Sequence, residues 1–165
     1  MPSASPPPRP AEALRVLLDH EVDFLVVGMV AAVLQGVPAA TFDVDIVHRR
    51  TPENVERLMR FLASVDATYR DRAGRRLPPD ARSLLGTGHN PFRTSLGDLD
   101  ALGALHGGRG YTELEPRSVV MKLGGVDLRV LSLEALIEEK ERLGREKDLA
   151  VLPLLRRTLA LGRGK

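Results

Sequence analysis

The chain has 165 residues, of which 43% are hydrophobic and 28% are charged, the balance of one ordinary globular domain. It contains no cysteine, which excludes disulfides, thiolate metal sites and cysteine nucleophiles and fits a cytoplasmic location. The net charge is only +2, so composition alone gives no signature of nucleic-acid binding. No stretch approaches the roughly 20 apolar residues of a membrane span, and no signal peptide is recognisable.

The N-terminal half carries short helical and extended patterns. Residues 1–10 are rich in proline and serine and are expected to form a disordered arm, so a single folded domain is predicted over residues 11–165. The apolar spacing predicts a helix over 11–20, a strand over 22–27, a helix over 28–35 and a strand over 42–47. Thr51 then provides the N-cap of a further helix, with Pro52 at its first position.

The C-terminal half begins with a long polar stretch. Residues 70–90 are rich in glycine, proline and arginine, which predicts a loop with at most one helical turn and with solvated arginines. The elements expected after it are strand material over 92–102, a hairpin over 118–123 and 126–131, a helix from Ser132 to Gly144, and a last helix over 147–161. Because strands and helices mix without strict alternation, the sequence predicts an α+β fold with a small mixed β-sheet flanked by helices.

Three acidic residues are the main candidates for a site. The alternation around residues 42–47 places Asp43 and Asp45 on one face of a single strand. Two carboxylates this close repel unless a cation lies between them, and Mg²⁺ binds one or two carboxylates together with substrate phosphates. Asp100 adds a third carboxylate, a set that suits metal-assisted nucleotidyl transfer. The alternative is an edge strand whose polar face is simply solvated.

Glycine and basic residues provide candidates for phosphate binding. Gly28 follows the first predicted strand and precedes a helix of small residues, so a phosphate can approach the helix N-terminus there. Lys140, Arg145 and Lys147 can reach phosphate from the end of a helix. The alternative is a solvated basic face that pairs with the neighbouring glutamates 138, 139 and 141.

The remaining polar residues are expected to lie outside the site. His48 is interpreted as an exposed residue at the end of a strand, and Asp98 as an exposed residue of a turn. His89 and His106 are interpreted as isolated loop residues.

The order of these residues resembles the minimal nucleotidyltransferase superfamily, in particular its AbiEii-like bacterial group. The resemblance rests on Gly28-Met29, Gly36, Thr41-Phe42-Asp43-Val44-Asp45, Gly97-Asp98-Leu99-Asp100 and the segments 124–134 and 140–149. It implies transfer of a nucleoside monophosphate from a nucleoside triphosphate to a hydroxyl on RNA, a protein or a small molecule, with Mg²⁺ or Mn²⁺. It also implies a toxin–antitoxin setting in which the partner is another protein chain.

The resemblance assigns roles to seven residues. Asp43 and Asp45 correspond to metal ligands and Asp100 to the third carboxylate, which assists as a ligand or a base. Gly28 and Met29 correspond to the pair that lines the phosphates. Lys140 and Lys147 are expected to neutralise phosphate charge.

Two positions depart from the pattern of that group. Met29 stands where glycine or serine is usual, and Ala39 stands where related bacterial proteins commonly carry arginine. The first change narrows the expected triphosphate path, and the second removes a phosphate partner. Both favour the alternative function, a non-catalytic module that keeps the fold and binds a nucleotide or a partner protein.

Overall fold

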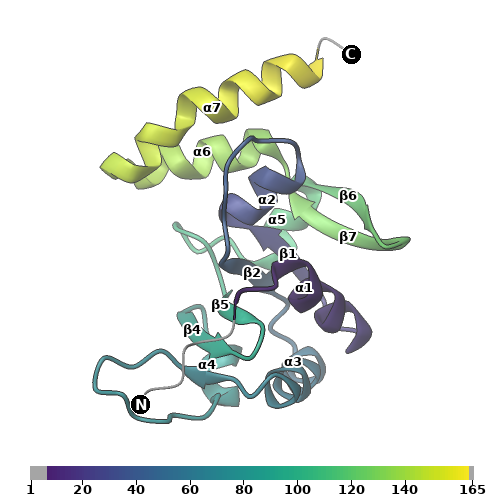
Figure 1. The fold of residues 1–165 in the computed structure, drawn as a ribbon, viewed down its shortest axis with the longest axis vertical. Coiled ribbons are helices and arrows are strands. Elements are labelled where there is room, and N and C mark those ends of the chain that lie inside the picture. The colour runs from purple at the N-terminus through teal and green to yellow at the C-terminus, as the bar shows by residue number, and fades with distance from the viewer. Residues whose placement is uncertain (1–6, 164–165) are drawn as a thin grey trace.

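The computed structural model describes residues 7–163, which form one mixed sheet with helices around it (Figure 1). The helices are α1 (Pro10–Asp19), α2 (Gly28–Leu34), α3 (Pro52–Ser64), α4 (Ala81–Leu85), α5 (Tyr111–Leu114), α6 (Leu133–Leu143) and α7 (Glu146–Arg163), with a 3-10 turn, η1, over Glu115–Arg117. The strands are β1 (Phe24–Val27), β2 (Val44–His48), β3 (Thr68–Tyr69), β4 (His89–Thr94), β5 (Gly97–Leu102), β6 (Ser118–Leu123) and β7 (Val126–Leu131). The predicted α+β fold with a mixed sheet is confirmed.

The sheet order places the acidic residues on neighbouring strands. Over the described residues the order is β3-β4-β5-β2-β1-β7-β6. Strand β2 is antiparallel to β1 and parallel to β5, and β1 is parallel to β7. In the β2–β5 register, Asp45 lies directly opposite Asp100. Two acids that are 55 positions apart in the chain therefore meet on adjacent strands.

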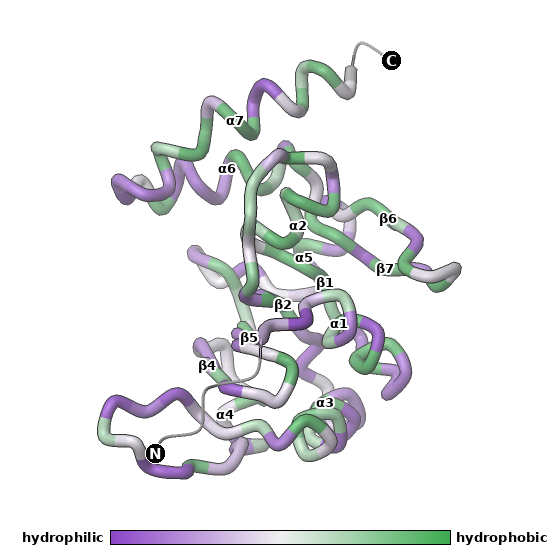
Figure 2. Tube along the Cα trace, in the orientation of Figure 1, coloured by the Kyte–Doolittle hydropathy of each residue, from purple (hydrophilic) through white to green (hydrophobic). Residues whose placement is uncertain are grey.

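The helices pack on the central strands and on one another. Helix α2 contacts β1, β2 and α6, while α1 contacts α3 and β2. Helices α6 and α7 lie side by side at one end of the molecule (Figure 1). All four residues of β1 are buried, and the central strands are predominantly hydrophobic, whereas much of the loop over 70–80 is hydrophilic (Figure 2). No helix within residues 7–163 has the length and apolarity needed to cross a membrane.

Local sequence signals account for the helix ends. The hydroxyl of Thr51 accepts a hydrogen bond from the Asn54 backbone N–H at 3.3 Å, and Pro52 is the first residue of α3, as predicted. Ser132 caps α6 in the same way, through the Ala135 N–H at 3.2 Å. Gly144 ends α6 with a left-handed φ of 60°, a conformation that glycine adopts without steric cost.

Several predicted limits differ from the structure, and three of these differences follow. Strand β2 begins at Val44, so Asp43 precedes the strand and does not share it with Asp45. Strand β4 begins at His89, within the predicted loop over 70–90, because His89 pairs with Leu102 of β5. The predicted arm over 1–10 includes Pro10, which is the first residue of α1, and Arg9, whose N–H donates to the Leu96 carbonyl at 2.8 Å. Residues 1–6 lie outside the described residues.

Candidate functional site

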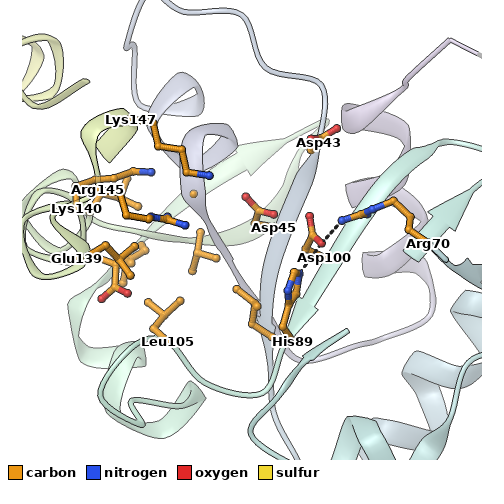
Figure 3. A pocket seen from close by; sticks show the side chains of 16 residues that line it. Asp43, Asp45, Arg70, His89, Asp100, Leu105, Glu139, Lys140, Arg145 and Lys147 are labelled. Atoms are coloured by element: carbon orange, nitrogen blue, oxygen red, sulfur yellow. Dashed lines mark hydrogen bonds and ion pairs between the residues drawn. The ribbon is translucent and has the colours of Figure 1, made fainter. Parts of the chain in front are cut away.

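A cavity of about 420 Å³ lies between the acidic ends of the central strands and the junction of α6 with α7. Figure 3 shows Asp43, Asp45 and Asp100 on one side of this cavity and Lys140, Arg145 and Lys147 on the other. The charged residues that line it are Asp43, Asp45, Asp100, Arg70, His89, Glu139, Lys140, Arg145 and Lys147. The structure therefore brings the predicted acidic and basic candidates to one pocket, together with Arg70 and His89, which were not predicted to belong there.

Asp45 and Asp100 form a hydrogen-bonded carboxyl pair. Burial, followed by the hydrogen bond and negative charge of Asp100, raises the pKa of Asp45 to about 7. Burial also acts on Asp100, but hydrogen bonds from His89, Arg70 and Asp45 outweigh it, and the pKa of Asp100 lies below its ordinary value. Below about pH 7 the pair therefore holds one proton, on Asp45, while Asp100 is ionised.

Two further side chains hold Asp100 from outside the pair. Arg70 Nη2 donates to Asp100 Oδ1 at 2.6 Å, and His89 Nε2 lies 2.7 Å from the same oxygen (Figure 3). The interpretations of His89 as an isolated loop residue and of Arg70 as a solvated residue are both wrong. The pairing of β4 with β5 places His89 opposite Leu102. Leu102 lies two residues along β5 from Asp100, so its side chain is on the same face of the sheet. Asp98 is half-buried and lies 3.9 Å from Arg70 Nε.

Asp43 lines the same cavity but stands apart from the pair. It is exposed in the segment before β2. Burial, with the charges of Asp98 and Asp100, raises the pKa of Asp43, and the charge of Arg70 opposes that rise. Within residues 7–163, no three acidic or histidine side chains are arranged so that one metal ion lies among them. The assignment of Asp43, Asp45 and Asp100 as metal ligands stays a prediction.

Position 28 requires glycine for two reasons, its backbone conformation and the closeness of Asp45. Its φ is +67°, in the region that residues with a side chain rarely adopt. A Cβ atom built on it would lie 2.3 Å from Asp45 Oδ2, far inside van der Waals contact. The missing side chain therefore leaves the space beside the Asp45 carboxyl group, where the end of β1 turns into α2, open to the cavity.

The basic side of the cavity is organised by a buried carboxylate that the sequence analysis overlooked. The side chain of Asp148 has no exposed surface and accepts hydrogen bonds from Lys140 Nζ at 3.1 Å and Arg145 Nε at 2.5 Å. The hydrogen bond from Arg145, with that from Lys140, lowers the pKa of Asp148 to about 2. Lys147 is exposed and makes no ion pair with any described residue.

The alternative in which this basic segment pairs with neighbouring glutamates is wrong. Those glutamates are bound elsewhere: Glu138 pairs with Arg117, Glu139 with Arg109, and Glu141 with Arg156. The positive charge of Lys140 instead reaches Asp45 across the cavity, where it opposes the rise in the pKa of that carboxyl.

Met29 and Ala39 lie against the hydrophobic core. Both are partly buried and packed on core residues, and neither lines the cavity. His48 also belongs to the core, and its interpretation as an exposed residue is wrong. Its side chain is buried, Nε2 lies 2.7 Å from the Leu84 carbonyl oxygen, and burial lowers its pKa.

Two solved structures share the fold that carries this cavity. A proposed nucleotidyltransferase from Thermotoga maritima superposes with a TM-score of 0.55 at 20% identity, over 86% of this chain and 89% of its own. The antibiotic-resistance factor ANT(2'')-Ia gives 0.58 at 12% identity, over 90% of this chain and 83% of its own. The sequence matches no family model and no curated protein. The likeness shows a nucleotidyltransferase-like fold, while membership of the AbiEii-like group stays a prediction.

Proposed function

We propose that the chain transfers a nucleoside monophosphate from a nucleoside triphosphate to a hydroxyl group, with the help of a divalent cation. The observation that supports this most is the arrangement of charges in one cavity. Asp45 and Asp100 meet on one side, and Lys140, Arg145 and Lys147 face them from the other. This reaction needs carboxylates that bind a cation and positively charged side chains that bind phosphate, and the same cavity holds both.

The carboxyl groups fit Mg²⁺ or Mn²⁺. Both ions prefer oxygen ligands, and Asp43 and Asp45 offer carboxylate oxygens to the cavity. The proton between Asp45 and Asp100 relieves the repulsion between their two carboxylates. A cation bound at the same place would relieve that repulsion in the same way. Gly28 keeps the space next to Asp45 Oδ2 free of a side chain. When bound, the ion supplies positive charge for the phosphate oxygens that gain negative charge during transfer.

The cations of the basic side are positioned for a triphosphate. Asp148 fixes the directions of Lys140 and Arg145, and such fixed donors stabilise a charged group without first having to reorganise. Lys147 adds a cation without an ion-pair partner among the described residues. We therefore assign the β- and γ-phosphates to this side of the cavity, next to Lys140 and Lys147.

The bond changes of the proposed reaction balance as follows. The oxygen of the acceptor hydroxyl forms a bond to the α-phosphorus, and the bond from that phosphorus to the bridging oxygen breaks and releases pyrophosphate. The hydroxyl proton passes to Asp100, the ionised member of the carboxyl pair. Gly28, where β1 turns into α2, is the residue of this turn that we place beside the phosphates.

The acceptor is a hydroxyl on RNA, a protein or a small molecule. The sequence resemblance to the AbiEii-like group supports a toxin–antitoxin setting with a second protein chain as partner. The cysteine-free composition supports a cytoplasmic location.

A non-catalytic binding module is the second candidate, and one observation favours it. Several charged residues of the site are already paired within the chain. Arg70 and His89 bind Asp100, while Lys140 and Arg145 bind Asp148. Ala39, which stands where proteins of the resembled group commonly carry arginine, favours the same function. Such a module binds a nucleotide or a partner protein without turnover.

Label transfer separates the two candidates. The full chain is incubated with Mg²⁺, a cell extract and each α-³²P-labelled nucleoside triphosphate in turn, and label is then measured in the RNA, protein and small-molecule fractions. We expect incorporation with wild type and none with Asp45→Asn. Binding of a triphosphate by calorimetry, with no incorporation into any fraction, would instead identify the module.

A further inference from the structure

Arg70 is held beside Asp100 at several points. Its guanidinium donates to Asp100 Oδ1 at 2.6 Å and to the Phe92 carbonyl oxygen at 2.8 Å, and its backbone N–H donates to the Pro91 carbonyl at 3.0 Å. Its Nε atom lies 3.9 Å from Asp98. Only 27% of the side chain is exposed, so this cation is part of the site and not a solvated residue of a loop.

These contacts use much of the ligand capacity of Asp100. A carboxylate has about four lone-pair sites, two on each oxygen. Oδ1 already contacts both Arg70 and His89, and the Asp45 carboxyl group is hydrogen-bonded to the same carboxylate. A divalent ion placed at Asp100 would also lie next to the positive charge of the Arg70 guanidinium. Repulsion by the guanidinium, and the few lone-pair sites that remain on Asp100, both disfavour an ion there.

Resting on the function proposed above, we propose that the Arg70 guanidinium takes the place of one of two divalent ions, so that the site binds a single ion through Asp43 and Asp45. In paired-metal phosphoryl transfer the ions lie about 3.5 to 4 Å apart, one near the attacking oxygen and one near the leaving oxygen. A guanidinium is a permanent cation with directed donors, and so supplies positive charge at a fixed place.

The position of Arg70 agrees with this role. In Figure 3 it approaches the acids from the side away from Lys140 and Lys147, which leaves the phosphate-binding side of the cavity open. Its guanidinium contacts Asp100 directly, whereas Asp43 and Asp45 line the cavity without an ion pair to Arg70. Arg70 is therefore a positioning residue that compensates the charge of Asp100 and directs the single ion to Asp43 and Asp45.

The number of bound ions tests the inference. Mn²⁺ is titrated into the full chain with each α,β-methylene nucleoside triphosphate, which is not turned over, and free Mn²⁺ is followed by electron paramagnetic resonance. We expect one Mn²⁺ per wild-type chain and two per chain for Arg70→Ala. Arg75→Ala is the matched control, because Arg75 pairs with Asp71 at 2.7 Å in the same loop but does not line the cavity. It should bind one ion.

A second variant guards against misfolding. Arg70→Gln removes the charge but keeps an N–H donor for the Phe92 carbonyl, and it should also bind two ions. Two ions in the wild type, or one ion in both Arg70 variants, would overturn the inference while leaving the proposed function intact. A wild-type chain that binds neither Mn²⁺ nor any triphosphate refutes the proposed function, and this inference with it.

Discussion

Asp45 on β2 and Asp100 on β5 lie directly opposite each other in a parallel register, and their carboxyl groups are hydrogen-bonded. The two acids differ because their surroundings differ. Asp45 faces the cavity beside Gly28, while Asp100 is bound by Arg70 and His89. One environment favours the neutral acid and the other the carboxylate, so the proton of the pair lies on Asp45.

This relationship predicts an unusual dependence of stability on pH. The pKa of Asp45 is raised from 3.8 to about 7, so between these values the folded chain holds a proton that the unfolded chain has lost. The contribution of Asp45 to the free energy of unfolding therefore falls as the pH rises from about 4 through 7. Asp45→Asn removes this fall, because its amide donates to Asp100 at every pH. We expect the variant to be more stable than wild type at pH 8, by about 1 to 3 kcal/mol.

Urea unfolding at pH 5, 6, 7 and 8 measures the effect. Asp127→Asn is a suitable control, since Asp127 is an exposed hairpin residue paired with Lys122. It should follow the wild-type trend. Equal pH dependence in wild type and Asp45→Asn would contradict the assignment of the proton to Asp45. Saturating Mg²⁺ should remove the fall in the wild type, because the ion replaces the proton.

Substitution of Gly28 should destabilise the fold by more than backbone strain alone, because the new side chain also displaces Asp45. Gly28→Ala introduces a Cβ 2.3 Å from Asp45 Oδ2 at a φ of +67°, so strain and displacement of Asp45 add together. Gly36→Ala is the matched control, because Gly36 has a φ of +99° and no atom within 4 Å of the new Cβ. We expect both variants to lose about 1 kcal/mol from backbone strain.

Only Gly28→Ala should lose more stability than this and also lose Mn²⁺ binding. Thermal unfolding and Mn²⁺ titration of the two variants provide the comparison. Normal Mn²⁺ affinity in Gly28→Ala would show that the cation does not use the Asp45 carboxylate.

The fold and several residues of the site could be predicted from local sequence patterns, whereas other residues of the site could not. Gly28, Asp45 and Asp100 were predicted to share a site from the acidic residues of two strand patterns, the glycine after the first strand and the family resemblance, and the structure brings all three to the cavity. Asp43 was placed on the strand by the same alternation, but the sheet pairing of β2 begins one residue later. A period-two pattern fixes which face a residue takes without fixing where pairing starts.

Arg70 and His89 were missed for a physical reason. Arg70 precedes a polar loop that also contains Asp71 and Asp80, which is the composition of a solvated segment. Its position depends on the two-residue strand β3 and on the Pro91 carbonyl of β4, contacts that no local pattern predicts. His89 lies between glycine and proline positions typical of loops, and only pairing with β5 makes it a strand residue. Asp148 was given no role from the sequence, although its carboxylate is what holds Lys140 in place.

Lys147 should contribute to triphosphate binding more than its exposure suggests. It lines the cavity and forms no ion pair with a described residue, so it is available for phosphate. We expect Lys147→Ala to weaken binding of a Mg²⁺–triphosphate complex about tenfold, the loss of one charge-assisted contact. Lys122→Ala removes an exposed lysine of the β6–β7 hairpin outside the cavity and should leave the affinity unchanged. Calorimetry of both variants at low salt gives the result, and equal affinities would place the phosphates elsewhere.

Met29 should prove neutral for nucleotide binding in a working enzyme. Its side chain packs against the core and does not line the cavity, so it leaves the path of the triphosphate open. Met29→Ser restores a residue common in the resembled group, and we expect it to change triphosphate affinity less than about twofold. It should lower the free energy of unfolding by about 1 to 2 kcal/mol, because apolar packing is lost.

The double variant Met29→Ser with Ala39→Arg extends this test to the choice between enzyme and binding module. In a working enzyme the added arginine raises triphosphate affinity only modestly, since Lys140 and Lys147 already face the phosphates. Calorimetry with each of the four triphosphates and Mg²⁺ measures the affinity, and label transfer by the same preparations measures turnover. Weak binding and no transfer in the wild type, with strong binding gained only in the double variant, would show that Met29 and Ala39 obstruct the site and that the chain is the non-catalytic module.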